Sequence, residues 1–240
     1  MQNTLFDLVI LPASIGILIL LLVSIMSKQA KPKPASIPSS TLTRENILGF
    51  FRQFADPDDA KRINIDGISK LADAIGLPID DVKLLALMWK LGAKEKPASI
   101  DEEEFVNGCM NFSGLSSASV DAFKSIVPML DPGFLEGAEF KDLYKFCFKF
   151  NLLESTHKYI EKEIALALLP VILDTNCAPH LNYFMQFLQQ NTKITRVTLD
   201  EWDQFYDFNC RIHDNLSNYD ADNSAYPVLL DEYVEYRKKA

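Results

Sequence analysis

The apolar residues of this 240-residue chain recur at helical spacing, and this pattern restricts the possible folds more than any other feature. From about residue 43 onward, side chains such as Ile47, Phe50 and Phe54 repeat every three or four positions, and short polar segments separate one stripe from the next. Only nine glycines and few alternating Val/Ile/Thr runs are present, which favours helices over strands. We therefore predict an all-α fold of about ten helices, with no convincing strand.

Several boundaries of these helices can be predicted from the residues. The segment 77–92 is apolar nearly all round, so we expect a central helix there. Ser99 with Glu102, and Thr198 with Glu201, have the spacing of capping boxes that open helices. A long helix is expected over 157–173, where Pro170 should kink or end it.

The N-terminal region differs from the rest in composition. Residues 8–26 contain no charge, and as a helix they would rise about 28 Å, close to the thickness of the hydrocarbon core. Three lysines that follow, at positions 28, 31 and 33, would place the remainder in the cytosol. An apolar tail that does not insert, giving a nuclear or cytoplasmic protein, is the alternative. The expected division is a transmembrane anchor over 1–28, a Pro/Ser/Lys-rich linker over 29–42 and a helical domain over 43–240.

The charge of the chain limits the class of partner. The net charge is −9, and because residues 1–40 carry about +2, the remainder carries about −11. An acidic body repels phosphate backbones, so nucleic acid is not expected and a basic protein surface is favoured. The cysteines are widely spaced, which predicts free thiols in a reducing compartment, at Cys109, Cys147, Cys177 and Cys210.

Two acidic segments imitate calcium loops without meeting the requirements of such loops. A calcium loop needs glycine at its sixth position and glutamate at its twelfth. The segment from Asp56 has Lys61 and Gly67 at these positions, and the segment from Asp220 has Ala225 and Asp231. We expect two degenerate, EF-hand-like helix-loop-helix units with no metal or cofactor, while a calcium-binding or other helical adaptor protein remains the alternative.

Catalytic candidates are weak. Cys210 and His213 lie three residues apart and could share a face of one helix, but no orienting group or phosphate loop accompanies them. We expect no catalytic residue, with a thiol hydrolase as the rival. The alternating aromatics Phe146, Phe148 and Phe150 are expected mainly in the core, although one could form the floor of an apolar pocket.

The acidic, aromatic run from Thr198 to Tyr236 suits a docking surface. It holds ten carboxylates and one arginine among helix-period apolar residues. If its two helices pack side by side, Asp200 and Asp231 could flank the small residue Ala225. A partner's apolar side chain would then fit between two basic contacts, although an ordinary solvated face would have the same spacing.

Seven segments carry a resemblance to a known family. They are INIDGISKLADAIGL, LLALMWKLGA, EEEFVNGC, EFKDLYKFCFKF, EIALAL, LDEWDQFYDF and LSNYDADNSAYPVLLDEYVEY. In this order, over about residues 45–236, they resemble the potentiating-neddylation domain of the defective-in-cullin-neddylation proteins. The resemblance implies an all-helical fold whose EF-hand-like pairs need no calcium.

The resemblance also implies a function. Family members are scaffold-type co-ligases without a catalytic residue. They bind the C-terminal winged-helix part of a cullin in cullin-RING ligases, and the acetylated N-terminus of a charged conjugating enzyme. Cullin binding is thereby implied for Asp200, Ala225 and Asp231. The pocket for the conjugating enzyme's N-terminus is implied at apolar positions, namely Ile65, Ile68, Leu84, Leu85, Ile100, Phe150, Ala167 and Val171.

Overall fold

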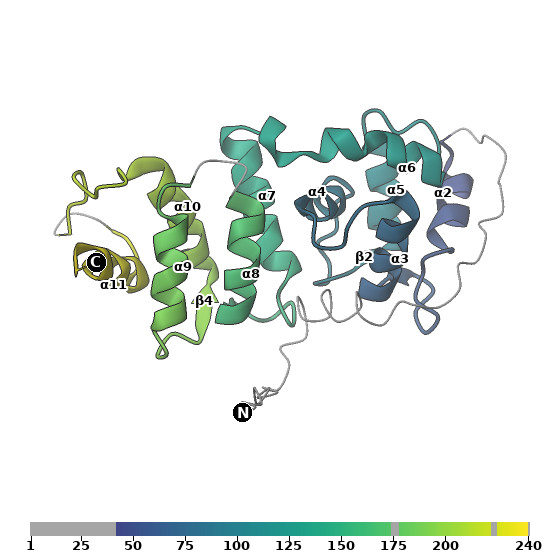
Figure 1. Cartoon of the computed structure of the whole chain (residues 1–240). Helices are drawn as coiled ribbons and strands as arrows, with labels where there is room; N and C mark the ends of the chain where they lie inside the picture. Colours follow the sequence, from purple (N-terminus) through teal and green to yellow (C-terminus); the bar gives the residue numbers. More distant parts are fainter. Residues whose placement is uncertain (1–41, 174–177, 222–224, 240) are drawn as a thin grey trace, which may run out of the picture.

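The computed structural model describes residues 42–173, 178–221 and 225–239, which form an elongated, mostly helical body (Figure 1). The predicted anchor over residues 8–26 and all but the last residue of the predicted linker lie outside the described residues. Within the described ranges, every helix is too short or too polar to cross a bilayer.

The first half of the body consists of two helix-loop-helix units joined by a short antiparallel sheet. Its elements in chain order are α2 (Arg44–Phe51), β1 (Arg62–Ile63), α3 (Ile65–Ile75), α4 (Val82–Lys90), β2 (Ile100–Asp101) and α5 (Glu102–Asn111). Ile63 lies opposite Ile100 in the sheet. A bridge of α6 (Val120–Ile126) and two short 3-10 helices, η1 (Val127–Leu130) and η2 (Pro132–Phe134), leads to the second half.

The second half repeats this arrangement and adds a terminal helix. Its elements are α7 (Gly137–Phe150), β3 (Tyr159–Glu161), α8 (Lys162–Leu173), α9 (Leu181–Gln190), β4 (Arg196–Thr198), α10 (Leu199–Arg211) and α11 (Val228–Lys239). Ile160 of β3 lies opposite Val197 of β4 in a second antiparallel pair. Figure 1 shows α7 and α8 in the middle of the body, with α4 on one side and α9 to α11 on the other.

These observations confirm a mostly helical fold, with ten α-helices in the described residues. The expectation of no convincing strand was wrong, because two strand pairs join the helical units. Each strand is only two or three residues long, too short for an alternating pattern to show in the sequence. The helix expected over 157–173 also begins later, at Lys162, because residues 159–161 pair with β4.

Local chemistry fixes the helix starts. At α10 the Thr198 hydroxyl accepts a hydrogen bond from the Glu201 amide, and the Glu201 carboxylate accepts one from the Thr198 amide, which confirms this capping box. The capping box of α5 consists of Asp101 and Glu104, so the prediction of Ser99 with Glu102 was wrong by two residues. Aspartate caps a helix as well as serine does, and both registers satisfy the sequence rule.

Pro170 lies in the last turn of α8 and does not end the helix. The helix continues to Leu173, and Leu169 and Ile172 are buried on either side of the proline. Packing of α8 against α9 therefore compensates for the backbone hydrogen bond that a proline cannot donate.

The segment from Asp56, the first of the two that resemble a calcium loop, is held by hydrogen bonds and an ion pair within the segment. The Asp56 carboxylate accepts hydrogen bonds from the Asp58 amide and the Asn64 side chain, and Asp59 forms an ion pair with Arg62 at 3.4 Å. The loop thus lies between α2 and α3, as expected for a degenerate unit. The segment from Asp220 instead joins α10 to α11, whereas the strands of the second half lie before α8 and α10.

Aromatic side chains form much of the core of both halves. In the first half the Phe50 and Phe123 rings stack with centroids 5.1 Å apart. In the second half Tyr144 of α7 and Trp202 of α10 stack at 4.6 Å. Each of these two residues also donates a side-chain hydrogen bond to the other's carbonyl oxygen, both at 3.0 Å. This reciprocal pair holds α10 in a fixed position on α7.

Candidate protein-docking surfaces

Asp200 has an exposed carboxylate at the start of α10, where a capping box and a strand pair hold the helix in place. It is the second residue of α10, two positions after the N-cap Thr198, and the strand pair β3–β4 anchors that end of the helix. The neighbouring Glu201 carboxylate already accepts a hydrogen bond from the Thr198 amide in the capping box. Asp200 itself has no hydrogen bond or ion pair among the described residues, so its charge is available to a partner.

The Asp231 carboxylate, in contrast, already has a hydrogen-bond partner within the protein. It lies half-buried in the first turn of α11 and accepts a hydrogen bond from the Tyr219 hydroxyl. The Tyr219 ring stacks on Tyr226, with centroids 6.1 Å apart. Ala225, the residue before Tyr226, is exposed. The exposed Ala225 thus precedes the tyrosine whose ring stacks on the hydrogen-bond donor of Asp231.

Aromatic contacts pack α11 and the loop that precedes it against α10. Phe208 contacts Tyr226 at 5.3 Å and Tyr233 of α11 at 5.8 Å, so the loop and α11 pack against the C-terminal part of α10. Asp200 precedes Phe208 by eight residues, a rise of about 12 Å along a helix. We refer to Asp200, Ala225 and Asp231, which come from the start of α10, the following loop and the first turn of α11, as the acid–alanine–acid face.

A buried histidine joins the elements beneath this face. The His180 side chain is fully buried at the start of α9. Its Nε2 lies 3.1 Å from the Ile212 carbonyl oxygen, so Nε2 carries the proton and donates. Its Nδ1 lies 3.1 Å from the Tyr233 hydroxyl, which donates to it. Burial lowers the pKa of His180 from its ordinary value and keeps the ring neutral.

A ladder of ion pairs connects α7 and α10. The Lys141 ammonium lies 2.7 and 2.8 Å from the two carboxylate oxygens of Asp207, and that of Lys145 lies 2.7 Å from Asp203. The ladder was not recognised in the sequence. A pattern that could have revealed it is the matched four-residue spacing of these lysines and aspartates, which places each set on one helix face.

A groove opens next to this ladder, with a volume of about 870 Å³. Its walls come from residues 93–97, from the C-terminal end of α7, from residues 152–158 and from the start of α10. Phe146 and Phe150 stack along it with centroids 5.1 Å apart. One alternative for the alternating aromatics, an apolar floor, fits these two rings. Phe148 also borders the groove but is almost fully buried against Trp202.

The eight residues of the implied N-terminus pocket are spread over five elements. Ile65 and Ile68 lie on α3, Leu84 and Leu85 on α4, Ile100 on β2, Phe150 at the end of α7, and Ala167 and Val171 on α8. Ile68, Leu84, Ile100 and Phe150 are buried, whereas the other four are half-buried. Phe150 lines the groove beside Asp200, and the other seven do not line it. The grouping of these residues as one pocket stays a prediction.

The rival sites receive little support from the geometry. Within residues 42–173, 178–221 and 225–239, no three His, Cys, Asp or Glu side chains are placed to hold a metal ion. Cys210 and His213 were expected on one helix, but this was wrong because α10 ends at Arg211, and His213 contacts Ser217 in the following loop. Cys109 and Cys147 are buried free thiols, and burial raises the pKa of Cys109 to about 12. Cys177 lies outside the described residues.

Comparison with known proteins identifies the family. Residues 122–236 match the sequence model of a family described as Cullin binding. The chain is 30% identical over 213 residues to DCN1-like protein 3 of Xenopus laevis, covering 86% of this chain and 67% of that protein. The chain belongs to the DCN1-like family. It is also 29% identical over 196 residues to DCN1-like protein 5 of Rattus norvegicus, covering 82% of this chain and 78% of that protein. Identity to DCN1-like protein 4 of Drosophila melanogaster is 28% over 224 residues, covering 87% and 86%.

The family match covers the whole acidic run from Thr198 to Tyr236 in this DCN1-like chain. Residues 122–236 include the three residues of the acid–alanine–acid face and three of the eight implied pocket residues, Phe150, Ala167 and Val171. The other five pocket residues lie in the first half of the body, before the matched segment. The family match therefore bears more directly on the face of α10 and α11 than on the apolar pocket.

Proposed function

We propose that this chain is a non-catalytic scaffold co-ligase that promotes the neddylation of cullins. The observation that carries the proposal is the match to the Cullin binding family over the segment that holds Asp200, Ala225 and Asp231. The exposed, unpaired Asp200 and the oriented Asp231 support a cullin-binding role, because a basic cullin surface would meet two carboxylates on either side of a small residue.

The second partner in this proposal is the acetylated N-terminus of the charged conjugating enzyme. The eight apolar side chains at Ile65, Ile68, Leu84, Leu85, Ile100, Phe150, Ala167 and Val171 would receive it. An apolar pocket favours an uncharged N-terminus, since burying a free ammonium without a partner is costly. We therefore assign the requirement for acetylation to desolvation.

Positioning would supply the rate enhancement. A scaffold that holds the cullin and the charged conjugating enzyme together converts an encounter of two molecules into a step within one complex. The fixed packing of α10 on α7, through the Tyr144–Trp202 pair and the ion-pair ladder, supports this role because it keeps the cullin face in a set orientation.

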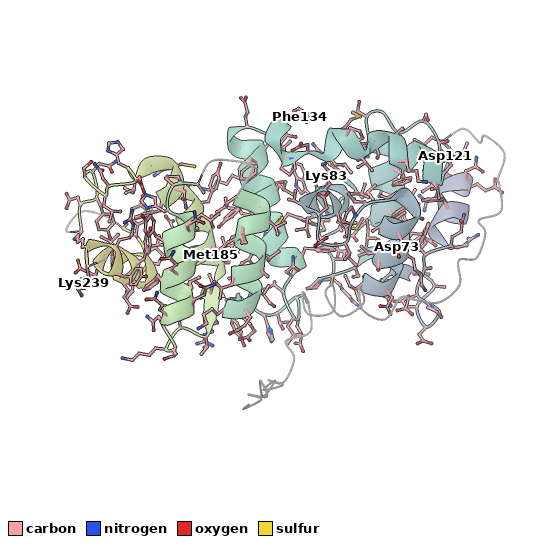
Figure 2. All side chains as sticks on the ribbon, viewed as in Figure 1. Asp73, Lys83, Asp121, Phe134, Met185 and Lys239 are labelled. Carbon is pink, nitrogen blue, oxygen red and sulfur yellow. The ribbon has the colours of Figure 1, made fainter. Side chains whose placement is uncertain are left out.

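A purified modification assay tests the proposal. Cullin neddylation is measured with and without the full chain, using an acetylated conjugating enzyme, for wild type and for the pair Asp200→Ala/Asp231→Ala. We expect acceleration by wild type and a loss of about tenfold or more in the pair, since two interfacial charges are removed. Asp73→Ala is the matched control, because Asp73 is exposed on α3 at the opposite end of the body (Figure 2). Equal acceleration by all three proteins would contradict the cullin face.

Attachment to a membrane through residues 8–26 is a separate part of the proposal. Its support is the charge-free length of that segment and the lysines that follow it. In a flotation assay with liposomes, the full chain should float and a chain from residue 42 should not. Recovery of both in the soluble fraction would contradict attachment.

A further inference from the structure

The groove between α7 and α10 lies where the ladder of ion pairs stops. Lys141 pairs with Asp207 and Lys145 with Asp203. Successive pairs of the ladder therefore lie four residues later on α7 and four residues earlier on α10. The next lysine on α7 is Lys149, and the next free acid toward the start of α10 is Asp200. Both line the groove, and neither has an ion-pair partner among the described residues.

The floor of the groove is apolar and accessible. Phe146 is half-buried, and its ring stacks on Phe150. Leu152 and Leu199, both half-buried, border the same space. A volume of about 870 Å³ accommodates several side chains of a bound segment. The unpaired charges therefore lie at the rim of a space that favours an apolar occupant.

The rim is basic in a chain that is acidic overall. Lys94, Lys96, Lys149 and Lys158 line the groove and are exposed. The acids that line it are Asp200, which is free, and Asp203, which pairs with Lys145. A complementary occupant carries carboxylates beside its apolar side chain. Residues 1–40 of this chain do not meet that requirement, because they hold three lysines and one acid.

We propose that this groove binds a segment of the cullin in which an apolar side chain lies between a basic residue and acidic residues. The basic residue contacts Asp200, the apolar side chain lies on the half-buried Phe146, and the acidic residues contact Lys149 and Lys158. The inference rests on the proposed function and extends it, because Asp200 belongs both to the acid–alanine–acid face and to the groove. The cullin contact would then continue from α11 across α10 to the end of α7.

The test measures the affinity of the full chain for an isolated cullin C-terminal domain by isothermal titration calorimetry. The variants are Asp200→Lys, which tests the cullin face, and Lys149→Glu/Lys158→Glu, which tests the groove. Lys70→Glu is a control, because Lys70 is an exposed lysine of α3 that does not line the groove. We expect each of the first two variants to weaken binding by about tenfold or more and the control to change it by less than about twofold. Circular dichroism confirms that each variant is folded.

Salt dependence gives a second measurement of the same contact. If carboxylates of the cullin contact Lys149 and Lys158, the affinity of wild type falls as ionic strength rises, and the affinity of the lysine pair variant falls less steeply. A slope that is unchanged in the lysine pair variant overturns the proposed contact.

The possible failures can be distinguished. If wild type does not bind the cullin domain, the proposed function fails and the groove assignment fails with it. If Asp200→Lys abolishes binding while Lys149→Glu/Lys158→Glu binds like wild type, only the groove assignment is overturned. If the lysine pair weakens binding of the acetylated conjugating enzyme and leaves cullin binding unchanged, the groove belongs to the other partner and our assignment is wrong.

Discussion

The two acids of the proposed cullin face differ in what their carboxylates already contact, and this difference separates binding from stability. Asp200 has no contact to lose among the described residues, so Asp200→Ala should weaken cullin binding and change the free energy of unfolding by less than about 0.5 kcal/mol. Asp231→Ala should weaken binding and also destabilise by about 1 kcal/mol, because the Tyr219 hydroxyl loses its acceptor. Urea unfolding and calorimetric binding of the same variants measure both effects.

Tyr219→Phe is the control for this comparison. It removes the hydrogen bond to Asp231 and keeps the charge, so it should lower stability by a similar amount while cullin binding is largely retained. A loss of binding in Tyr219→Phe as large as that in Asp231→Ala would mean that orientation of the carboxylate, and not its charge alone, determines affinity.

Because His180 is buried, we expect the stability of the protein to depend on pH through the titration of this side chain. Burial lowers its pKa in the folded protein below the ordinary value of 6.5, against the opposing effect of its hydrogen bond to the Ile212 carbonyl. The unfolded chain therefore binds more protons between the two pKa values. The stabilising effect of the neutral ring is complete above about pH 6.5 and is lost as the pH falls toward the folded-state pKa.

Replacing the ring tests this dependence. At pH 7.5, His180→Asn should destabilise the protein by about 2 kcal/mol or more, since it removes the ring packed 4.8 Å from Phe208 and disturbs two hydrogen bonds. The difference between wild type and variant should shrink at pH 5.5. Urea unfolding at both pH values measures it, and a difference that stays constant would show that His180 does not titrate in this range.

At the scale of elements, glycine determines how closely α5 approaches the end of α4. A Cβ atom at Gly108 would lie 2.5 Å from Leu91 Cα and would also collide with the Leu91 carbonyl oxygen. Gly108→Ala should therefore push the two helices apart and destabilise by about 2–4 kcal/mol. Gly49 on α2 is exposed and has no atom within 4 Å of an added Cβ. Gly49→Ala should stabilise by up to about 1 kcal/mol.

Thermal unfolding of Gly108→Ala and Gly49→Ala compares a crowded glycine with an uncrowded one. The midpoint should fall in Gly108→Ala and rise slightly in Gly49→Ala. Destabilisation of similar size in both variants would indicate that loss of glycine flexibility, and not the close contact with Leu91, determines the outcome.

The helices could be predicted because each buries a stripe that is visible in the local sequence. The strands could not, since a pair such as Ile63 and Ile100 is defined by its partner across the fold. Pro170 does not end α8, because tertiary packing outweighs this local preference, whereas the kink that was the other alternative stays a prediction. Of the candidate site, the acids of the C-terminal run are evident in the sequence. The groove is not, because Lys149 and Asp200 line one space only through the packing of α7 on α10.

At the scale of the whole molecule, the two proposed binding regions lie on different parts of one body. The acid–alanine–acid face belongs to α10 and α11 at one end, and most of the implied pocket residues belong to α3, β2 and α4 (Figure 1). Helices α7 and α8 lie between these regions, and α7 packs on both α4 and α10. This continuous packing would fix the distance between a bound cullin and a bound conjugating enzyme.

A scaffold that bridges two partners has a characteristic dependence on its own concentration. The rate of cullin neddylation should rise as the chain is added, because more ternary complexes form. It should then fall to at most about half of its maximum when the chain exceeds both partners, since each partner then occupies a separate copy. Asp200→Lys should shift the maximum to higher concentration, because it weakens one of the two contacts. A titration at fixed low concentrations of cullin and charged conjugating enzyme measures the curve. A rate that rises to a plateau without decline would point instead to activation of one partner by binding alone, and would contradict the bridging mechanism while leaving cullin binding intact.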